Sequence, residues 1–399
     1  MTRAITGKRL TIALGSAQLL AWGSSYYLLA TLGRPMARGF DIDPAWIYGS
    51  FSVALLVAAV LGPLVGRYID RNGGRRVLIG SNLFFAAALL FMAVATNPWM
   101  LMLGWVLLGA AMPFGLYDAA MATMVRLRGL RSRSGIVGIT LIAGFASSVS
   151  WPVTAFIESQ LDWRMACVFW AALHLTVGLG IHTRFVPRFI AEPPVPPDPD
   201  APPVVAPPGA PPAVFGLLVI AFTSSGFVFA AMATHMPQML IESGVPPSAA
   251  VGAAALVGIS AVVGRLAEAG LLRRFHPLIS GYVASGLHPL GAGLLLVLGA
   301  PFAAFFAALH GAGIGLMTIV KGTLPLQLFG PHGFGRRAGL LEAPSRVVQA
   351  ATPLLFGIAL ERLHGGALWI TFAAGLITFL ALLGAGHLSK KSHHAQNPA

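Results

Sequence analysis

The sequence has few charged residues. Only 10% of its 399 residues are Asp, Glu, Lys or Arg, against about 25% in a soluble domain. A water-soluble globule of this size needs more charge to cover its surface. Together with a hydrophobic fraction of 56%, this shortage predicts a membrane protein.

Cysteine and acidic residues are also scarce. Cys167 is the only cysteine, which excludes an intrachain disulfide and a cysteine zinc site, and we expect neither a metal nor a cofactor. Acidic residues number 13 against 26 basic ones, for a formal net charge of +13. The basic residues form short clusters between apolar runs, as in loops between membrane helices, which argues against nucleic-acid binding.

Twelve apolar segments are each long enough to cross a hydrocarbon core of about 30 Å, which needs roughly 20 residues. They lie near 10–32, 46–66, 77–96, 99–125, 135–157, 163–185, 213–235, 248–270, 278–299, 301–327, 338–360 and 366–386. The first is too long for a signal peptide, so we expect it to be retained. The sequence therefore predicts an all-α polytopic membrane protein with twelve transmembrane helices in two six-helix halves.

A Pro-rich stretch separates the two groups of six segments. This composition favours an extended tether, although prolines also bind proline-recognition domains. We expect an N-terminal half at 1–186, a cytoplasmic linker at 187–212 and a C-terminal half at 213–399.

The basic residues predict the orientation. If the amino terminus is inside, 20 of the 26 Lys and Arg residues fall in inner loops and tails, four in outer loops and two within spans. By the positive-inside rule both termini are cytoplasmic, and we expect residence in the plasma or inner membrane.

A short motif recurs in both halves, in register, 198 residues apart. Its members are Gly66, Asp70, Arg71, Gly73, Arg75 and Arg76 in the first half, and Gly264, Arg265 and Glu268 in the second. The chain is thus predicted to consist of two parallel halves, a recurring transporter design with the binding site between them.

The first copy resembles the loop signature of the major facilitator superfamily, Gly-x-x-x-Asp-Arg/Lys-x-Gly-x-Arg/Lys-Arg/Lys. It lies where that family has it, between the second and third helices on the inner side. The run Asp162-Trp163-Arg164 before the sixth segment also resembles the family. The resemblance covers nearly the whole chain and implies the family's fold, alternating access, and a motif that latches the halves together in one state.

The motif residues suit a latch. Gly66 and Gly73 allow close backbone approach, and Asp70 can face the positive end of a neighbouring helix. The three arginines can hold acidic side chains or lipid phosphates. The alternative is a topology signal alone, which needs no glycine or acid at fixed positions.

Two departures argue against drug/proton antiport. Trp105 stands four residues before Gly109, where proton-coupled members often carry arginine. The fifth segment has Trp151-Pro152 without the glycines that surround this proline in drug antiporters.

A few charges lie inside the predicted spans. Asp118 in the fourth and Lys321 in the tenth each lie about 10 Å from the inner end of the span. An isolated charge at that depth costs at least about 2.5 kcal/mol, so we expect the two to pair across a central cavity. A purely structural salt bridge is the alternative.

The eleventh segment carries Glu342, Arg346 and Gln349 on one face. Arg346 is a candidate for carboxylate binding, unless it pairs locally with Glu342. His310 shares a stripe with Lys321 and is a candidate proton carrier, although a lone histidine is more often a core residue.

Aromatic and polar stripes are typical of a solute cavity, and also of ordinary helix packing. The candidates are Gln18, Trp22, Tyr26, Tyr117 and Trp151.

These features predict a secondary active transporter that moves a small solute, an organic anion such as a monocarboxylate or a zwitterion, by alternating access. Coupling to a proton or ion gradient is expected, because no nucleotide-binding loop occurs. An exporter of hydrophobic or toxic compounds and a non-transporting membrane receptor are the alternatives. No catalytic motif predicts an enzyme. We expect membrane lipids as partners, no nucleic acid, and a monomer.

Overall fold

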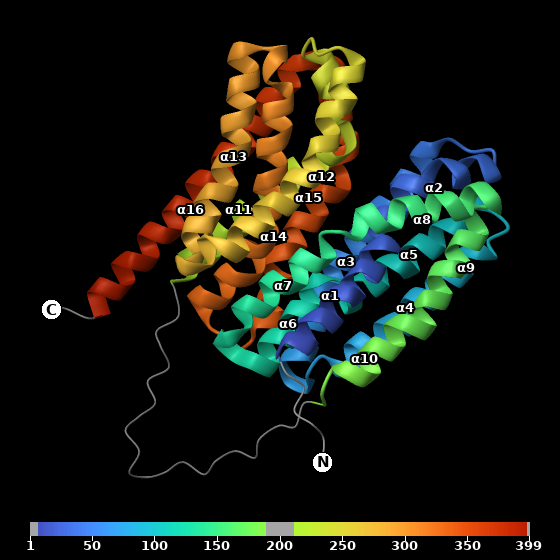
Figure 1. Cartoon of the computed structure of the whole chain (residues 1–399), viewed down its shortest axis with the longest axis horizontal. Helices are drawn as coiled ribbons and strands as arrows, with labels where there is room; N and C mark the ends of the chain where they lie inside the picture. The colour runs from blue at the N-terminus through green and yellow to red at the C-terminus, as the bar shows by residue number, and fades with distance from the viewer. Residues whose placement is uncertain (1–6, 189–210, 397–399) are drawn as a thin grey trace.

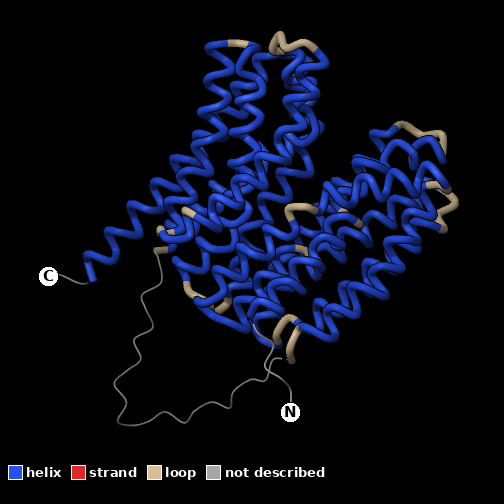
Figure 2. The backbone as a smooth tube through the Cα atoms, viewed as in Figure 1, coloured by secondary structure: helices blue, strands red, loops and turns tan. Residues whose placement is uncertain are grey.

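The structure is a computed structural model that describes residues 7–188 and 211–396. Helices and short loops make up this part of the chain, and it contains no strand (Figure 2). The all-α prediction is confirmed. The predicted linker, 187–212, lies almost wholly outside the described residues, so its tether role stays a prediction.

The N-terminal half contains ten α-helices. They are α1 (Gly7–Gly23), α2 (Tyr26–Gly39), α3 (Pro44–Asn72), α4 (Arg75–Ala93), α5 (Pro98–Gly115), α6 (Tyr117–Arg128), α7 (Arg133–Ala143), α8 (Ala146–Gln160), α9 (Trp163–Leu173) and α10 (Leu179–Phe185). The number exceeds six because the first, fourth and fifth predicted spans are broken, and a π-helical turn divides the sixth.

The break in the first span has a local cause. Gly23 ends α1, and the hydroxyls of Ser24 and Ser25 both turn back to the carbonyl oxygen of Ala21. Serine hydroxyls compete in this way with the helical backbone. Within a membrane, irregular backbone is tolerated where protein or a water-filled cavity surrounds it. The breaks therefore mark places where a cavity is expected.

The C-terminal half has one helix for each predicted span. These are α11 (Pro212–Glu242), α12 (Pro247–Gly270), α13 (Pro277–Leu298), α14 (Ala303–Phe329), α15 (Phe334–Leu363) and α16 (Leu368–Gln396). Several extend beyond the predicted segments, because hydropathy detects only the apolar part of a helix. Proline opens α11, α12 and α13, where its missing N–H leaves no hydrogen bond unmade.

Nine helical segments of the described chain are long and apolar enough to cross a membrane. Two of them, 98–160 and 334–390, each contain two of the predicted spans, while the first predicted span is divided into the shorter α1 and α2. The predicted count of twelve crossings is consistent with these segments but stays a prediction.

The two halves are separate bundles that meet at one end and diverge toward the other (Figure 1). At the end where they meet, α3, α6 and α7 of the first half contact α12, α14 and α15 of the second. We call this the inner end, because it carries the loops with most basic residues.

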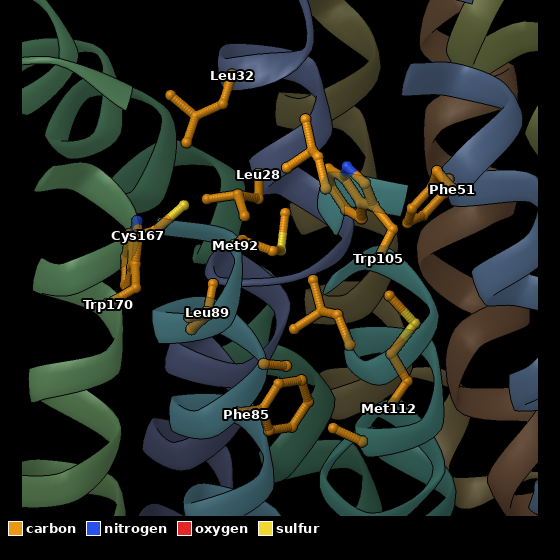
Figure 3. Close-up of a cluster of buried hydrophobic side chains, with 14 of the residues drawn as sticks. Leu28, Leu32, Phe51, Phe85, Leu89, Met92, Trp105, Met112, Cys167 and Trp170 are labelled. Carbon is orange, nitrogen blue, oxygen red and sulfur yellow. The ribbon is translucent and has the colours of Figure 1, made fainter. Parts of the chain in front are cut away.

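A close-packed core holds the N-terminal half together (Figure 3). Its largest side chains include Phe85 and Trp105, both fully buried. The Phe51 and Trp105 rings are nearly perpendicular, with 5.5 Å between their centroids. Without a hydrophobic drive between helices in lipid, such packing stabilises the bundle.

Candidate functional site

Glycines bring α3 and α15 into close contact at the inner end. A Cβ atom added at Gly66 would overlap the carbonyl oxygen of Gly335, and one at Gly339 would lie 2.6 Å from Cα of Pro63. Only glycine permits this approach of two backbones. The two helices come from opposite halves, so this contact closes the inner end.

Asp70 joins the halves beside this crossing. Its carboxylate accepts hydrogen bonds from the backbone N–H groups of Gly335 and Arg336, both at 2.8 Å. These amides belong to the first turn of α15, where a helix is partially positive. The positive helix end that the sequence suggested for Asp70 thus belongs to the other half.

The other motif residues have local roles. Gly73 has a φ of 76°, which favours glycine. Arg75 donates to the backbone carbonyl oxygens of Thr183 and Val186 at the end of α10 and not to an acidic side chain, while its binding of a lipid phosphate stays a prediction. Arg71 is exposed, as is Arg76.

The second copy of the motif makes its own bridge. Glu268 is fully buried and accepts hydrogen bonds from Arg133, at 3.1 Å, and from the Ser280 hydroxyl. Arg133 is the first residue of α7, in the first half. Gly264 contacts α14 of its own half instead. Arg265 lies within α12 and is buried.

His276 lies beside this second bridge, at the N-terminus of α13 and outside the spans. Its Nδ1 accepts a hydrogen bond from the N–H of Leu278 at 3.2 Å. Partial burial lowers the pKa of His276, and the positive charges of Arg133 and Lys390 lower it further.

A cavity of about 160 Å³ lies between the two halves, bounded on the inner side by these contacts. Eight of the eleven predicted substrate or coupling residues line it: Trp22, Tyr26, Tyr117, Asp118, Lys321, Glu342, Arg346 and Gln349. Two of the three broken spans, α1–α2 and α5–α6, contribute, as expected for irregular backbone at a cavity.

Two ion pairs form part of the cavity wall. Arg346 pairs with Asp118 in the opposite half, and Lys321 pairs with Glu342 at 3.0 Å in its own half. The predicted pair between Asp118 and Lys321 is therefore wrong, and so is the local alternative between Glu342 and Arg346. The observed pairing follows from the orientation of α15 about its axis, because this helix places Arg346 toward α6 and Glu342 toward α14.

Polar and aromatic contacts complete this wall. The Tyr26 hydroxyl donates to Oε1 of Gln349 at 3.0 Å, which joins α2 to α15. The Trp22 ring lies 5.0 Å from Tyr26 and 5.1 Å from Tyr117 between centroids, while its Nε1 is buried without a hydrogen-bond partner. This wall thus contains tilted aromatic pairs and one indole N–H without a partner.

Three predicted residues lie elsewhere. Gln18 is buried and donates to the carbonyl oxygen of Gly115 at 2.7 Å. The Trp151 side chain is largely exposed and contacts Tyr27. His310 is buried against His288, with 2.8 Å between the Nδ1 atoms, which is the core position given as the alternative to a proton carrier. Stripe patterns could not give the rotation of these helices toward the cavity.

Two features were missed. Phe222 and Phe229 line the cavity from α11, and their seven-residue spacing could have revealed a shared face. In the first half, His174 contacts Ser24 at 2.7 Å and Asn82 at 3.0 Å, forming a buried polar network. Polar residues within otherwise apolar spans were the signal.

Comparisons with known proteins identify the family. The Major Facilitator Superfamily model matches residues 14–317, more than half of the sequence. The chain belongs to the Major Facilitator Superfamily. A gentisate transporter of Corynebacterium glutamicum is 25% identical over 404 residues, which cover 95% of this chain and 88% of that protein.

Solved structures of this superfamily share the fold. The human organic anion transporter MFSD10 (TETRAN) matches with a TM-score of 0.72 at 16% identity, over 94% of this chain and 99% of that one. FucP in the outward conformation matches with a TM-score of 0.72 at 13% identity, over 94% of this chain and 98% of that one. The predictions of superfamily membership and of a membrane transporter fold are confirmed. Within the described residues, no group of three or more His, Cys, Asp or Glu could hold a metal ion.

Proposed function

We propose that this superfamily member is a secondary transporter that moves a small aromatic carboxylate by alternating access. The cavity between the halves carries the proposal. Its volume of about 160 Å³ is close to that of an engineered cavity of about 150 Å³ that binds benzene. One aromatic ring with small substituents is therefore a suitable occupant.

The chemistry of the lining favours the same class. Trp22, Tyr117 and Phe222 offer ring faces, and Arg346 presents a planar fork that matches a carboxylate. The Lys321 ammonium lies 5.6 Å from the centroid of Phe222, so a cation and a ring face occur together. The relative named a gentisate transporter and the structural neighbour named an organic anion transporter support this class.

The proposed orientation has both termini on the cytoplasmic side of the cytoplasmic membrane. With the inner end closed by Asp70 and Glu268, the cavity then faces outward. The structural neighbour FucP is named as outward in conformation. The contacts at the inner end would open in the opposite state, which is the proposed role of the motif as a latch.

Proton coupling is part of the proposal. Asp118 and Glu342 are carboxylates in a mostly enclosed site, and protonation of either would free its basic partner for the substrate. A structural neighbour is named as a fucose:proton symporter, which supports this type of coupling in the fold. An exporter of hydrophobic compounds needs no ion pairs in its cavity. A receptor that does not transport needs no latch at the inner end.

Uptake into proteoliposomes tests the proposal. Purified protein should accumulate labelled gentisate, a dihydroxybenzoate, when the exterior is acidic, and a protonophore should abolish the accumulation. Gentisamide, with a neutral amide in place of the carboxylate, should compete poorly. Uptake of neither compound by protein that binds gentisate would favour a receptor. Absence of gentisate binding would contradict the proposed substrate class.

A further inference from the structure

Arg265 is a buried cation without a counter-charge. It lies in α12 with 9% of its surface exposed, and its Nε has no hydrogen-bond partner. No hydrogen bond or ion pair joins its guanidinium to any residue that the structure describes. An unpaired charge buried in a membrane protein is costly and usually faces a cavity or a ligand.

The nearest acidic residue along the helix, Glu268, has other hydrogen-bond partners. Glu268 is three residues away, where a helix places neighbouring side chains. Its two oxygens accept from Arg133 and Ser280, and the ion pair with Arg133 closes the inner end. Arg265 is thus left positive by the same contact that holds the two halves together.

The guanidinium lies at the boundary between the halves. A Cβ atom added at Gly144 would be 2.7 Å from Nη1 of Arg265. Gly144 follows the last residue of α7, where the fifth span breaks, about 16 Å along the helix from Arg133 at 1.5 Å per residue. Arg265 also acts electrostatically on Tyr117, which lines the central cavity. A ligand that reaches Arg265 would extend the cavity past Tyr117.

The charges of the described cavity cancel without Arg265. Arg346 pairs with Asp118, and Lys321 pairs with Glu342, which leaves no net charge to favour an anion. Arg265 adds a single positive charge beside this neutral set. One carboxylate per substrate molecule would balance it.

From these contacts we propose that Arg265 and the Tyr117 hydroxyl form a carboxylate-binding subsite beside the central cavity, on the side where α7 meets α12. This inference deepens the proposed function and rests on it. Arg265 comes from the second half and Tyr117 from the first, so a bound carboxylate bridges the halves. Its ring then occupies the aromatic cavity. The unpaired cation thus supplies specificity for anions before protonation frees either of the paired cations, Lys321 and Arg346.

Calorimetric titration of the purified protein with gentisate and gentisamide tests the subsite. The wild type should bind gentisate more tightly than gentisamide. Arg265→Gln should lower gentisate affinity about 10- to 100-fold, as expected for a lost charged hydrogen bond, and leave gentisamide affinity unchanged. Arg265→Lys should fall between, because lysine keeps the charge but loses the fork.

Arg67 provides a matched control. It occupies the same position in the first copy of the motif, and its side chain is exposed. Arg67→Gln should leave both affinities at the wild-type values. An equal loss in both variants would show that net charge alone acts, which overturns the subsite.

Stability without ligand separates this role from a structural one. Removing an unpaired buried charge relieves its desolvation, so Arg265→Gln should have a thermal midpoint in detergent equal to or above that of the wild type. A structural ion pair would give the opposite result. A clear loss of midpoint in ligand-free Arg265→Gln would overturn the proposal.

Gly144→Ala supplies a second variant that leaves Arg265 in place. The added methyl group would displace the guanidinium, so gentisate affinity should fall while gentisamide affinity stays. In the Arg265→Gln background the same change should have no further effect on gentisate. Additive losses would contradict action through Arg265.

The outcomes distinguish this inference from the proposed function. If the wild type binds and transports gentisate but Arg265→Gln binds it normally, the subsite is wrong and the transport function stands. If the wild type binds no aromatic carboxylate, both fail.

Discussion

Asp118 and Arg346 form an ion pair that joins the two halves across the central cavity. Arg346 also donates to the carbonyl oxygen of Ala58 at 3.4 Å, so one guanidinium contacts two elements of the opposite half. The pair is mostly enclosed, with 12% of the Arg346 side chain and 21% of Asp118 exposed. It is both a wall of the cavity and a link that must change when the halves move.

A double-mutant cycle should show coupling between these two residues. Asp118→Asn leaves Arg346 unpaired, and Arg346→Gln leaves Asp118 unpaired, so each change should lower the stability of the detergent-solubilised protein. Because the double variant removes both charges, the coupling free energy should be about 1–3 kcal/mol. Thermal or denaturant unfolding measures it.

The control for this cycle uses the other cation. Lys321 pairs with Glu342, so Asp118→Asn and Lys321→Gln should be additive within about 0.5 kcal/mol. Strong coupling between Asp118 and Lys321, with none between Asp118 and Arg346, would contradict the observed pairing.

The distance of each charged residue from the inner end of its span could not identify these partners. Asp118 and Lys321 lie at the same distance from the inner ends of their spans, which made them the expected pair. Pairing depends on the rotation of each helix about its axis, and α15 carries both Glu342 and Arg346 on the cavity side. The residues of the site were thus largely predictable from charge within apolar spans, whereas their contacts were not.

Asp70→Asn should weaken the closed inner end. The amide loses the charge that favours the first turn of α15, so the state open at the inner end should gain population. Transport rate should fall, while gentisate affinity should change less than about tenfold, or 1.4 kcal/mol, because Asp70 lies away from the cavity. Uptake and equilibrium binding measure the two effects; normal uptake at normal protein levels would exclude a latch.

Gly66→Ala should act on the same contact by steric overlap. The new methyl group meets the backbone of Gly335 and cannot be accommodated by a side-chain shift, so the inner end should close poorly and transport should fall strongly. Gly80→Ala is the control, because no atom lies within 4 Å of its added Cβ. That variant should transport normally, and alanine should favour the helix by up to about 1 kcal/mol. Equal activity of the two variants would contradict the close crossing.

Acidification should weaken the second bridge through His276. Its pKa is lowered in the folded protein, whereas an unfolded histidine titrates near about 6.5, so the unfolded state binds more protons below that pH. Stability should therefore fall between about pH 7 and pH 5. The thermal midpoint of His276→Gln should drop less than that of the wild type across this range. Identical drops would contradict a role for His276.

The fold was more predictable than the inner contacts. The length of the apolar segments and the positions of the basic residues depend only on the surrounding membrane and water. They therefore predicted an all-helical membrane protein in two halves. Arg265 shows the limit of this reasoning. It occupies the motif position of Arg67, and both residues lie within their helices, yet Arg67 is exposed whereas Arg265 is buried between the halves. Burial between halves depends on tertiary packing, which periodicity does not encode.

Distances between spin labels test the central claim, that substrate exchange at the cavity opens the inner end and closes the outer one. In a Cys167→Ala background, Asn72→Cys with His332→Cys reports the inner end, and Thr96→Cys with Ser248→Cys reports the outer end; all four positions are exposed and each pair spans the two halves. With saturating gentisate, the inner pair should gain a longer distance and the outer pair a shorter one. Unchanged distances at both ends, in protein shown by its thermal shift to bind gentisate, would contradict alternating access.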